Sequence, residues 1–157
     1  LFWLMGSLST RAYLTVGFIW LYILVGFLWL WSKGVSLNLI TLGEDAAMYL
    51  GVEPGALQRQ VFIASSLMIG AMVSVSGMIG FVGLMVPHVM RLLIGSDHRL
   101  LLPASFLAGG IFLCWADTFA RVLLAPAELP VGIVTAFFGG PFFLFLLYRE
   151  GRRSLGL

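Results

Sequence analysis

The sequence predicts an all-α membrane protein with about five transmembrane helices and a short cytoplasmic helix after the first. Two observations predict this class. The 157 residues are 61% hydrophobic and only 10% charged, with a mean hydropathy of +1.05. Soluble domains carry about 25% charged residues, so this chain has too few charges to cover a water-facing surface. The second observation is a series of long charge-free stretches, which are typical of membrane spans.

Four charge-free stretches mark the candidate spans: 12–32, 60–90, 100–116 and 129–148. A helix needs about 20 apolar residues to cross the hydrocarbon core, so the first and last stretches fit one helix each. The third stretch is slightly short but can extend into its flanks. The second is too long for one span at about 1.5 Å per residue. Gly77 and Gly80 lie near its middle and favour a tight turn there. We therefore predict one membrane domain, 1–157, with spans at about 12–32, 57–76, 81–93, 100–117 and 129–148.

The distribution of basic residues favours five spans over four. Cytoplasmic loops of membrane proteins are enriched in Lys and Arg. With five spans, only Arg11 and Arg121 of the 9 basic residues fall on the outer side. Four spans divide the basic residues less sharply. The C-terminus is cytoplasmic in both arrangements, but only five spans place Glu44 on that side.

The predicted cytoplasmic loop, about 37–55, contains a short helix. Glu44 and Asp45 fall in its first turn, where acidic side chains interact favourably with the helix dipole. Gly51 is a typical C-terminal stop. A helix this short is not stable alone in water. We therefore expect it to dock on a partner protein in the cytoplasm.

Small residues and a proline mark two of the spans. Small residues recur at four-residue spacing on the second span: Ser66, Gly70 and Ser74. This spacing favours close helix packing, and a pore-lining role is the alternative. The run Gly139-Gly140-Pro141 is predicted to interrupt the last span near its centre. Interrupted membrane helices occur where the backbone is buried in protein or lines a cavity, so this run indicates a candidate pathway.

Few side chains could carry chemistry. Lys33 is the only lysine and lies in no Gly-x-x-x-x-Gly-Lys-Ser/Thr loop, so phosphate binding by that device is excluded. His88, Asp97 and His98 could form a metal site, but their spacing matches no standard ligand pattern. We predict no metal and no catalytic residue, and instead an inner-face loop anchored by hydrogen bonds: Arg91, Asp97, His98 and Arg99. A membrane-embedded metal enzyme using His88 and His98 is the alternative from another class.

The remaining candidates lie near the fourth predicted span. Asp117 and Arg121 are four residues apart, so a helical ion pair is the simplest interpretation. The functional alternative is that Arg121 meets an acidic partner outside the membrane. Cys114 is expected to be a small buried packing residue.

Several motifs follow one another through most of the chain: GMIGFVGLMVPHVMR at 77–91, GSDHR at 95–99, LLP at 101–103, ADxxAR at 116–121, ELPVGIVTA at 128–136 and GxPxF at 139–143. In these motifs the chain resembles the FecCD-type permeases of bacterial ABC importers. That family takes up ferric siderophores, haem and vitamin B12. The resemblance implies the C-terminal half of a ten-span permease.

The resemblance also implies roles for the candidate residues. A cytoplasmic ABC ATPase subunit would be seated by the loop around the short helix: Leu42, Gly43, Glu44, Ala47, Leu50 and Gly51. Arg121 would pair with a glutamate of a periplasmic or lipid-anchored substrate-binding protein. A second permease copy would complete a dimer. The chain would bind no cofactor, because ATP and Mg would be held by the ATPase subunit.

The function implied by the resemblance is that of a permease subunit rather than an enzyme. It would be a multi-pass protein of the bacterial inner membrane, in contact with lipid and without a nucleic-acid partner. An iron–siderophore chelate is the leading expected substrate. A haem or cobalamin permease is the alternative within the family.

Overall fold

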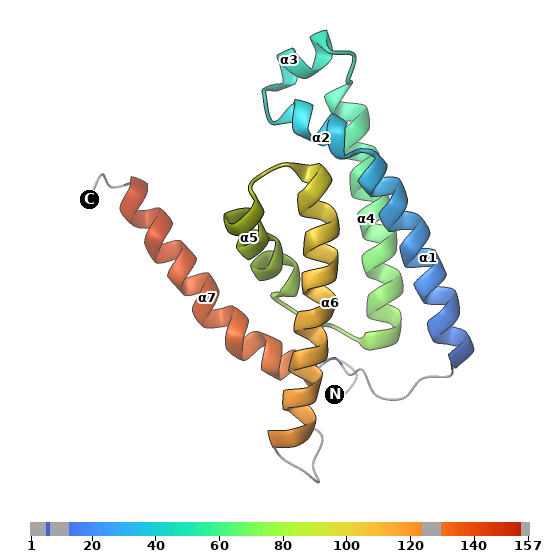
Figure 1. Cartoon of the computed structure of the whole chain (residues 1–157), viewed down its shortest axis with the longest axis vertical. Helices are drawn as coiled ribbons and strands as arrows, with labels where there is room; N and C mark the ends of the chain where they lie inside the picture. The colour runs from blue at the N-terminus through green and yellow to red at the C-terminus, as the bar shows by residue number, and fades with distance from the viewer. Residues whose placement is uncertain (1–5, 7–12, 124–129, 155–157) are drawn as a thin grey trace. The chain divides into compact units, whose positions relative to one another are not determined.

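The computed structural model describes residue 6 and residues 13–123 and 130–154, and the regular structure in these residues is α-helical. The helices in chain order (Figure 1) are α1 (Tyr13–Ser32), α2 (Gly34–Ile40), α3 (Glu44–Tyr49), α4 (Pro54–Ser76), α5 (Val82–Ile94), α6 (His98–Leu123) and α7 (Val131–Ser154). The predicted all-α class is therefore confirmed.

A helix lies at each predicted span. Three of the described helices are long and apolar enough to cross a membrane: Thr15–Ser32, Pro54–Ser76 and His98–Val122. Shorter apolar helices lie at the third and fifth predicted spans: Val82–Ile94 and Val131–Leu146. The outermost predicted positions, residues 12 and 129, lie outside the described residues, as do Arg11 and Glu128.

The turn predicted between the second and third spans is present. Gly77 has a φ of 70°, and Phe81 has a φ of 67°. A positive φ is unusual for a bulky residue such as phenylalanine, so tertiary contacts must hold Phe81 in place. The long charge-free stretch 60–90 therefore contains two helices, α4 and α5.

The last helix is continuous where an interruption was predicted. Residues 139–141 all lie within α7, with Pro141 inside it, and neither Gly139 nor Gly140 has a positive φ. Proline removes one backbone hydrogen bond of a helix, but membrane helices tolerate this when neighbouring groups compensate. The prediction of a broken helix at Gly139-Gly140-Pro141 was wrong.

Three further details differ from the sequence prediction. The short helix α2 was not predicted at all. The helix α6 continues past residue 117 to Leu123, so Asp117 and Arg121 lie within it. Cys114 is exposed rather than buried, since it lies on a face of α6 that no described residue covers.

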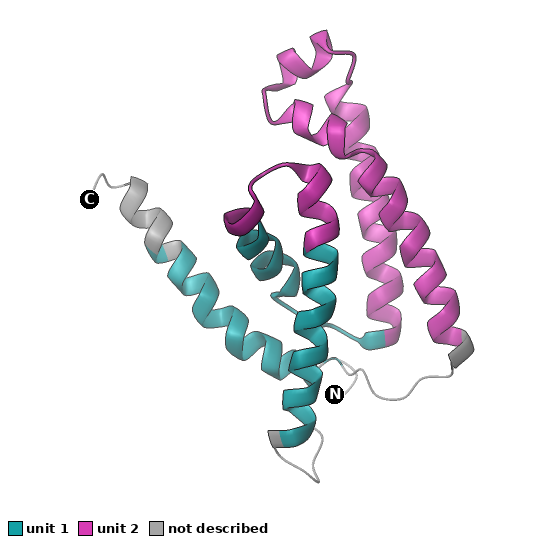
Figure 2. Cartoon of the chain, viewed as in Figure 1, with its two compact units in different colours: residues 1–8, 76–90, 105–157 teal, residues 9–75, 91–104 magenta. Residues whose placement is uncertain are grey.

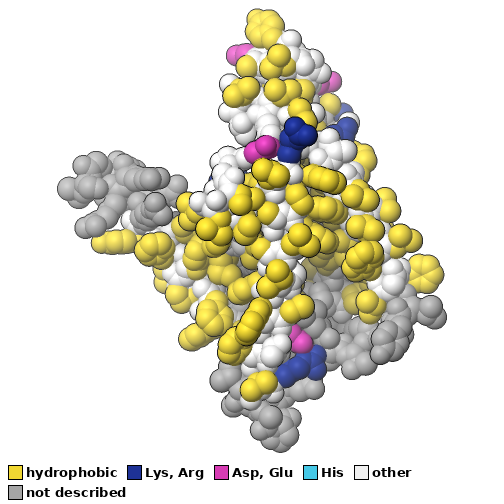
Figure 3. Space-filling view, in the orientation of Figure 1, with side chains coloured by type: hydrophobic (Ala, Val, Ile, Leu, Met, Phe, Trp, Pro, Cys, Tyr) yellow, Lys and Arg dark blue, Asp and Glu magenta, His cyan; other side chains and the backbone are white. Residues whose placement is uncertain are grey.

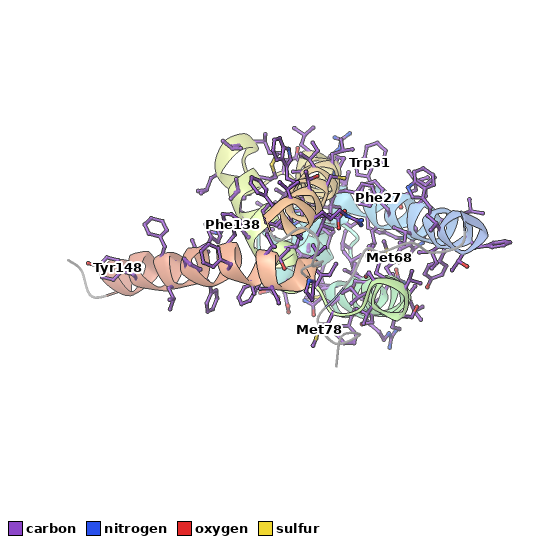
Figure 4. All side chains as sticks on the ribbon, turned by 90° about the horizontal axis from the view of Figure 1, so that it is seen from below. Phe27, Trp31, Met68, Met78, Phe138 and Tyr148 are labelled. Carbon is purple, nitrogen blue, oxygen red and sulfur yellow. The ribbon has the colours of Figure 1, made fainter. Side chains whose placement is uncertain are left out.

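The chain divides into two compact units, residues 1–8, 76–90 and 105–157 and residues 9–75 and 91–104 (Figure 2). In the second of these units, α1 and α4 lie side by side. A Cβ placed on Gly26 of α1 would come within 2.7 Å of the Sδ atom of Met68 on α4, a side chain labelled in Figure 4. Met68 is buried. A small residue on α1 therefore lets the two helices approach closely, as is common in membranes.

The first unit has its own small core between α6 and α7. Ala116 and Ala120 of α6 pack with Val131 and Val134 of α7. Thr135, which follows Val134 in the sequence, is fully buried. Its hydroxyl donates a hydrogen bond to the carbonyl of Gly132 at 3.1 Å. That local bond satisfies a polar group which would otherwise be costly to bury.

Apolar side chains cover most of the described helical surface. On the face shown in Figure 3, hydrophobic side chains lie along α1 and α6, whereas charged side chains gather around α2 and α3 and at the C-terminal end of α6. Large side chains such as Phe18, Phe62 and Phe137 are each more than 70% exposed. Soluble monomers rarely expose apolar patches of this extent, so this surface belongs against lipid or other protein.

Candidate functional site

The helix α3 begins and ends where the sequence predicted. Gly43 precedes it with a φ of 113°, and its carbonyl accepts the N–H of Ala47 at 3.0 Å. Gly51 follows with a φ of 81°. Both glycines adopt a backbone conformation that other residues take only with strain. They therefore fix a tight entry and exit for a helix of 6 residues.

The face that α3 turns outward is largely apolar. We define the α3 apolar surface as Leu42, Met48, Tyr49 and Leu50, which are 68%, 54%, 92% and 60% exposed. Ala47, predicted as a partner contact, is fully buried and so supports α3 from within. Sequence reasoning missed Met48 and Tyr49 as candidate contact residues, although both are large apolar residues in the predicted short helix.

Two contacts hold α3 on its own unit. The helix packs against α2, as Figure 1 shows. The Nε2 atom of Gln58, on α4, donates a hydrogen bond to Oε1 of Glu44 at 3.3 Å. The α3 apolar surface is therefore presented by a supported segment rather than a free loop.

A hydrogen-bonded network ties α2 to the start of α6. We call Asn38, Asp97 and His98 the Asn38 network. The Nδ2 atom of Asn38 donates to Oδ1 of Asp97 at 2.6 Å, and its Oδ1 accepts the backbone N–H of His98 at 2.8 Å. The Nδ1 atom of His98 lies 2.7 Å from the same Oδ1. Because that oxygen can only accept, His98 carries its proton on Nδ1 in this arrangement.

Asp97 also begins α6. Its Oδ1 accepts the backbone N–H of Arg99 at 2.9 Å, and its carbonyl accepts the N–H of Leu101 at 2.8 Å. A side-chain acceptor at this position satisfies a free donor of the first helical turn. Asp97 therefore caps the N-terminus of α6. His98 and Arg99, predicted as loop residues, lie in the first turn of α6.

The pKa of Asp97 lies below its ordinary value of 3.8, first because the Asn38 amide donates to the carboxylate and next because the Arg99 N–H does. Both bonds favour the charged form. The ionised carboxylate therefore stabilises the fold at neutral pH. That contribution is lost as the pH falls through the lowered pKa.

Further contacts join α1 to the same region. The indole Nε1 of Trp31 donates to the carbonyl of Arg99 at 2.9 Å. A Cβ on Gly34 would lie 3.4 Å from the Arg99 Cα. The Lys33 ammonium lies over the Trp29 ring, 5.3 Å from its centroid, a cation–π contact. Trp31 thus acts as a structural hydrogen-bond donor between α1 and α6.

The described residues do not support a metal centre. Within 13–123 and 130–154, no group of three His, Cys, Asp or Glu side chains could hold an ion. His98 is engaged by Asn38. His88 instead makes an edge-on contact with Phe142, with ring centroids 5.9 Å apart.

The other predicted site residues take separate positions. Arg121 Nε donates to Asp117 Oδ2 at 2.8 Å, with side chains 47% and 25% exposed, so the helical pair is confirmed. Ser66, Gly70 and Ser74 are exposed on α4, and no described residue packs on Gly70. Gly139 is buried against Phe81, whereas Gly140 has open space around its Cα. Arg91 lies in the last turn of α5.

Comparison with known families accounts for this arrangement of helices and polar loops. The model of the FecCD transport family matches residues 1–149. The chain belongs to the FecCD transport family. This membership confirms the resemblance drawn from the motifs, and the relatives of the chain are named as transport permease proteins.

Individual relatives agree with the family. The hemin transport system permease protein HmuU of Yersinia pestis is 44% identical over 154 residues, covering 98% of this chain and 46% of the relative. The permease protein YvrB of Bacillus subtilis, of an uncharacterized ABC transporter, is 46% identical over 98% of this chain and 44% of its own length. The vitamin B12 import system permease protein BtuC of Klebsiella pneumoniae is 39% identical over 98% of this chain and 46% of its own length.

A solved structure shows the same fold. It is described as an inward-facing conformation of a metal-chelate type ABC transporter, and it matches with a TM-score of 0.86 and 39% identity. The match covers 94% of this chain and 49% of that one. The chain therefore spans about half the length of the relatives it matches.

Proposed function

We propose that this chain forms part of the permease of a binding-protein-dependent ABC importer in a bacterial inner membrane. The observation that carries the proposal is the α3 apolar surface of this FecCD family member. The short helix α3 that presents this surface is supported by α2. Four large exposed apolar side chains on and beside such a short helix favour a protein partner. The partner we propose is a separate cytoplasmic ABC ATPase subunit, which holds ATP and Mg.

The rest of the assembly follows from the same proposal. A periplasmic or lipid-anchored binding protein delivers the cargo to the outer face, and a second permease copy completes the pathway. ATP binding and hydrolysis move α3, and the Asn38 network transmits that movement to α6. Relatives of this chain are named for hemin and for vitamin B12, and a structural neighbour for a metal chelate.

The cargo we propose is a bulky metal chelate. Ferric siderophore, haem and cobalamin are the candidates, and the named relatives favour the last two. Uptake into proteoliposomes loaded with the ATPase subunit would compare the three directly. The cargo that stimulates ATP hydrolysis through its binding protein is the substrate.

Replacing Tyr49 by alanine should weaken binding of the ATPase subunit more than about fivefold. Tyrosine residues that become buried at an interface commonly contribute more than 1 kcal/mol, and Tyr49 is 92% exposed in this chain. The measurement is the affinity of the detergent-purified full-length permease for its ATPase subunit. Phe62→Ala is the matched control, since Phe62 is 71% exposed but lies within the candidate span of α4. Equal affinity for Tyr49→Ala and the parent would contradict the proposal.

Replacing Arg121 by alanine should lower the affinity of the binding protein a few-fold at low salt. An exposed cation steers an acidic partner, and screening by salt should reduce the difference. Asp117→Asn is the control, because it breaks the ion pair with Arg121 but keeps the cation. If both variants lose affinity equally, the pair is structural and Arg121 is not a docking residue.

A further inference from the structure

A cavity of about 550 Å³ lies in the second unit, where α1 ends and α6 begins. Its apolar wall is formed by Leu28, Val35 and Leu100, and Trp31 lies beside them. Its polar end carries Asp97 and Arg99. Cavities of this size accommodate small organic molecules.

The position of the cavity is that of a membrane–water boundary. The cavity lies at the ends of two candidate membrane spans, since α1 ends at Ser32 and α6 begins at His98. Tryptophan is enriched at this depth of a membrane. Leu28 thus lies within the α1 span, whereas Asp97 and Arg99 lie at the start of the α6 span.

The two charges in the cavity are opposite and each has capacity for a ligand. No carboxylate in the described part of the chain lies within salt-bridge distance of the Arg99 guanidinium. The Asp97 carboxylate accepts the Asn38 amide and the Arg99 backbone N–H through the same oxygen, Oδ1. Its other oxygen, Oδ2, can accept from a further donor. Among the described residues, the hydrogen bonds of Arg99 outside the α6 ladder are those of its backbone N–H and its carbonyl.

We propose that this cavity binds the headgroup of phosphatidylethanolamine. The lipid phosphate pairs with the Arg99 guanidinium, and the primary ammonium donates to Asp97 Oδ2. Its acyl chains lie along Leu28, Val35 and Leu100. Phosphatidylglycerol carries the same phosphate but no ammonium to neutralise Asp97, and its hydroxyls donate only weaker, uncharged-donor hydrogen bonds. Phosphatidylcholine has a quaternary ammonium, which cannot donate a hydrogen bond. The inference requires only that α1 and α6 span a membrane, and it stands independently of the importer proposal.

Native mass spectrometry of the full-length permease tests this site. The protein is delipidated and titrated with phosphatidylethanolamine, phosphatidylglycerol and phosphatidylcholine of identical acyl chains. We expect about a tenfold preference for phosphatidylethanolamine, as charge-assisted hydrogen bonds are the strong ones. Arg99→Gln and Asp97→Asn should each remove that preference. Asp97→Asn keeps an acceptor for the Arg99 N–H, so the start of α6 survives.

Two control variants make the result specific. Arg99→Lys keeps the cation and should retain the preference. Arg91→Gln removes an exposed cation of α5 that does not line the cavity and should change nothing. Equal binding of the three lipids, a preference for phosphatidylglycerol, or a preference that survives Arg99→Gln would overturn the proposal. So would the absence of any bound lipid, which would show that another segment fills the cavity.

Discussion

Replacing Asn38 by aspartate is expected to lower substrate-stimulated ATP hydrolysis and transport at least about tenfold. Aspartate matches asparagine in shape, but it places a second carboxylate where the Nδ2 donor lies 2.6 Å from Asp97 Oδ1. Like charges this close cannot both be ionised without cost, and a hydrogen bond to a charged group is lost as well. The link between α2 and α6 should then open. Proteoliposome transport and ATPase assays measure the effect.

The design of this test separates coupling from folding and from subunit binding. The ATPase subunit should still bind the Asn38→Asp variant, because the α3 apolar surface is unchanged. The double variant Asn38→Asp/Asp97→Asn exchanges the two side chains, so the network again contains one amide and one carboxylate. This double variant should recover much of the activity. Full activity of the single variant, or no recovery in the exchanged one, would show that the network does not carry coupling.

Much of the helical framework follows from local chemistry. Charge-free stretches locate α1, α4, α5, α6 and α7 because an apolar helix of about 20 residues is what a membrane accommodates. The turn at Gly77 was predictable from its glycines, and the helix that starts at Glu44 from its first-turn acids and the glycine stop after it. Each depends on residues within a few positions of it. Prediction succeeded wherever the cause was local.

The candidate site depended on contacts that the sequence does not mark. Asn38 bonds to residues 59 and 60 positions away, so nothing in its neighbours identifies Asp97 and His98 as partners. Ala47 and Tyr49 are two positions apart on α3, yet one is buried and the other 92% exposed. Which face of so short a helix is covered is decided by α2 and α4. The Gly139-Gly140-Pro141 run has local signals for a break that tertiary packing overrides.

That packing gives the second large expected effect. A Cβ on Gly139 would overlap the Cβ and Cγ atoms of Phe81, and these atoms are too close to the backbone to swing away. We therefore expect Gly139→Ala to destabilise the permease by about 1–3 kcal/mol, as for overpacked cores. Thermal unfolding in detergent should show a midpoint lower by several degrees. Gly140→Ala is the control on the same turn, because its Cβ would meet no atom within 4 Å.

A second substitution identifies the cause. Phe81→Gly removes both clashing atoms, and glycine adopts the φ of 67° at this position without strain. In the Phe81→Gly background, the added Gly139→Ala change should cost little, so the two effects should be strongly non-additive. An equal cost of Gly139→Ala in both backgrounds would assign the loss to α7 itself. Non-additivity would instead assign the loss to the contact between residue 139 of α7 and Phe81 in the turn before α5.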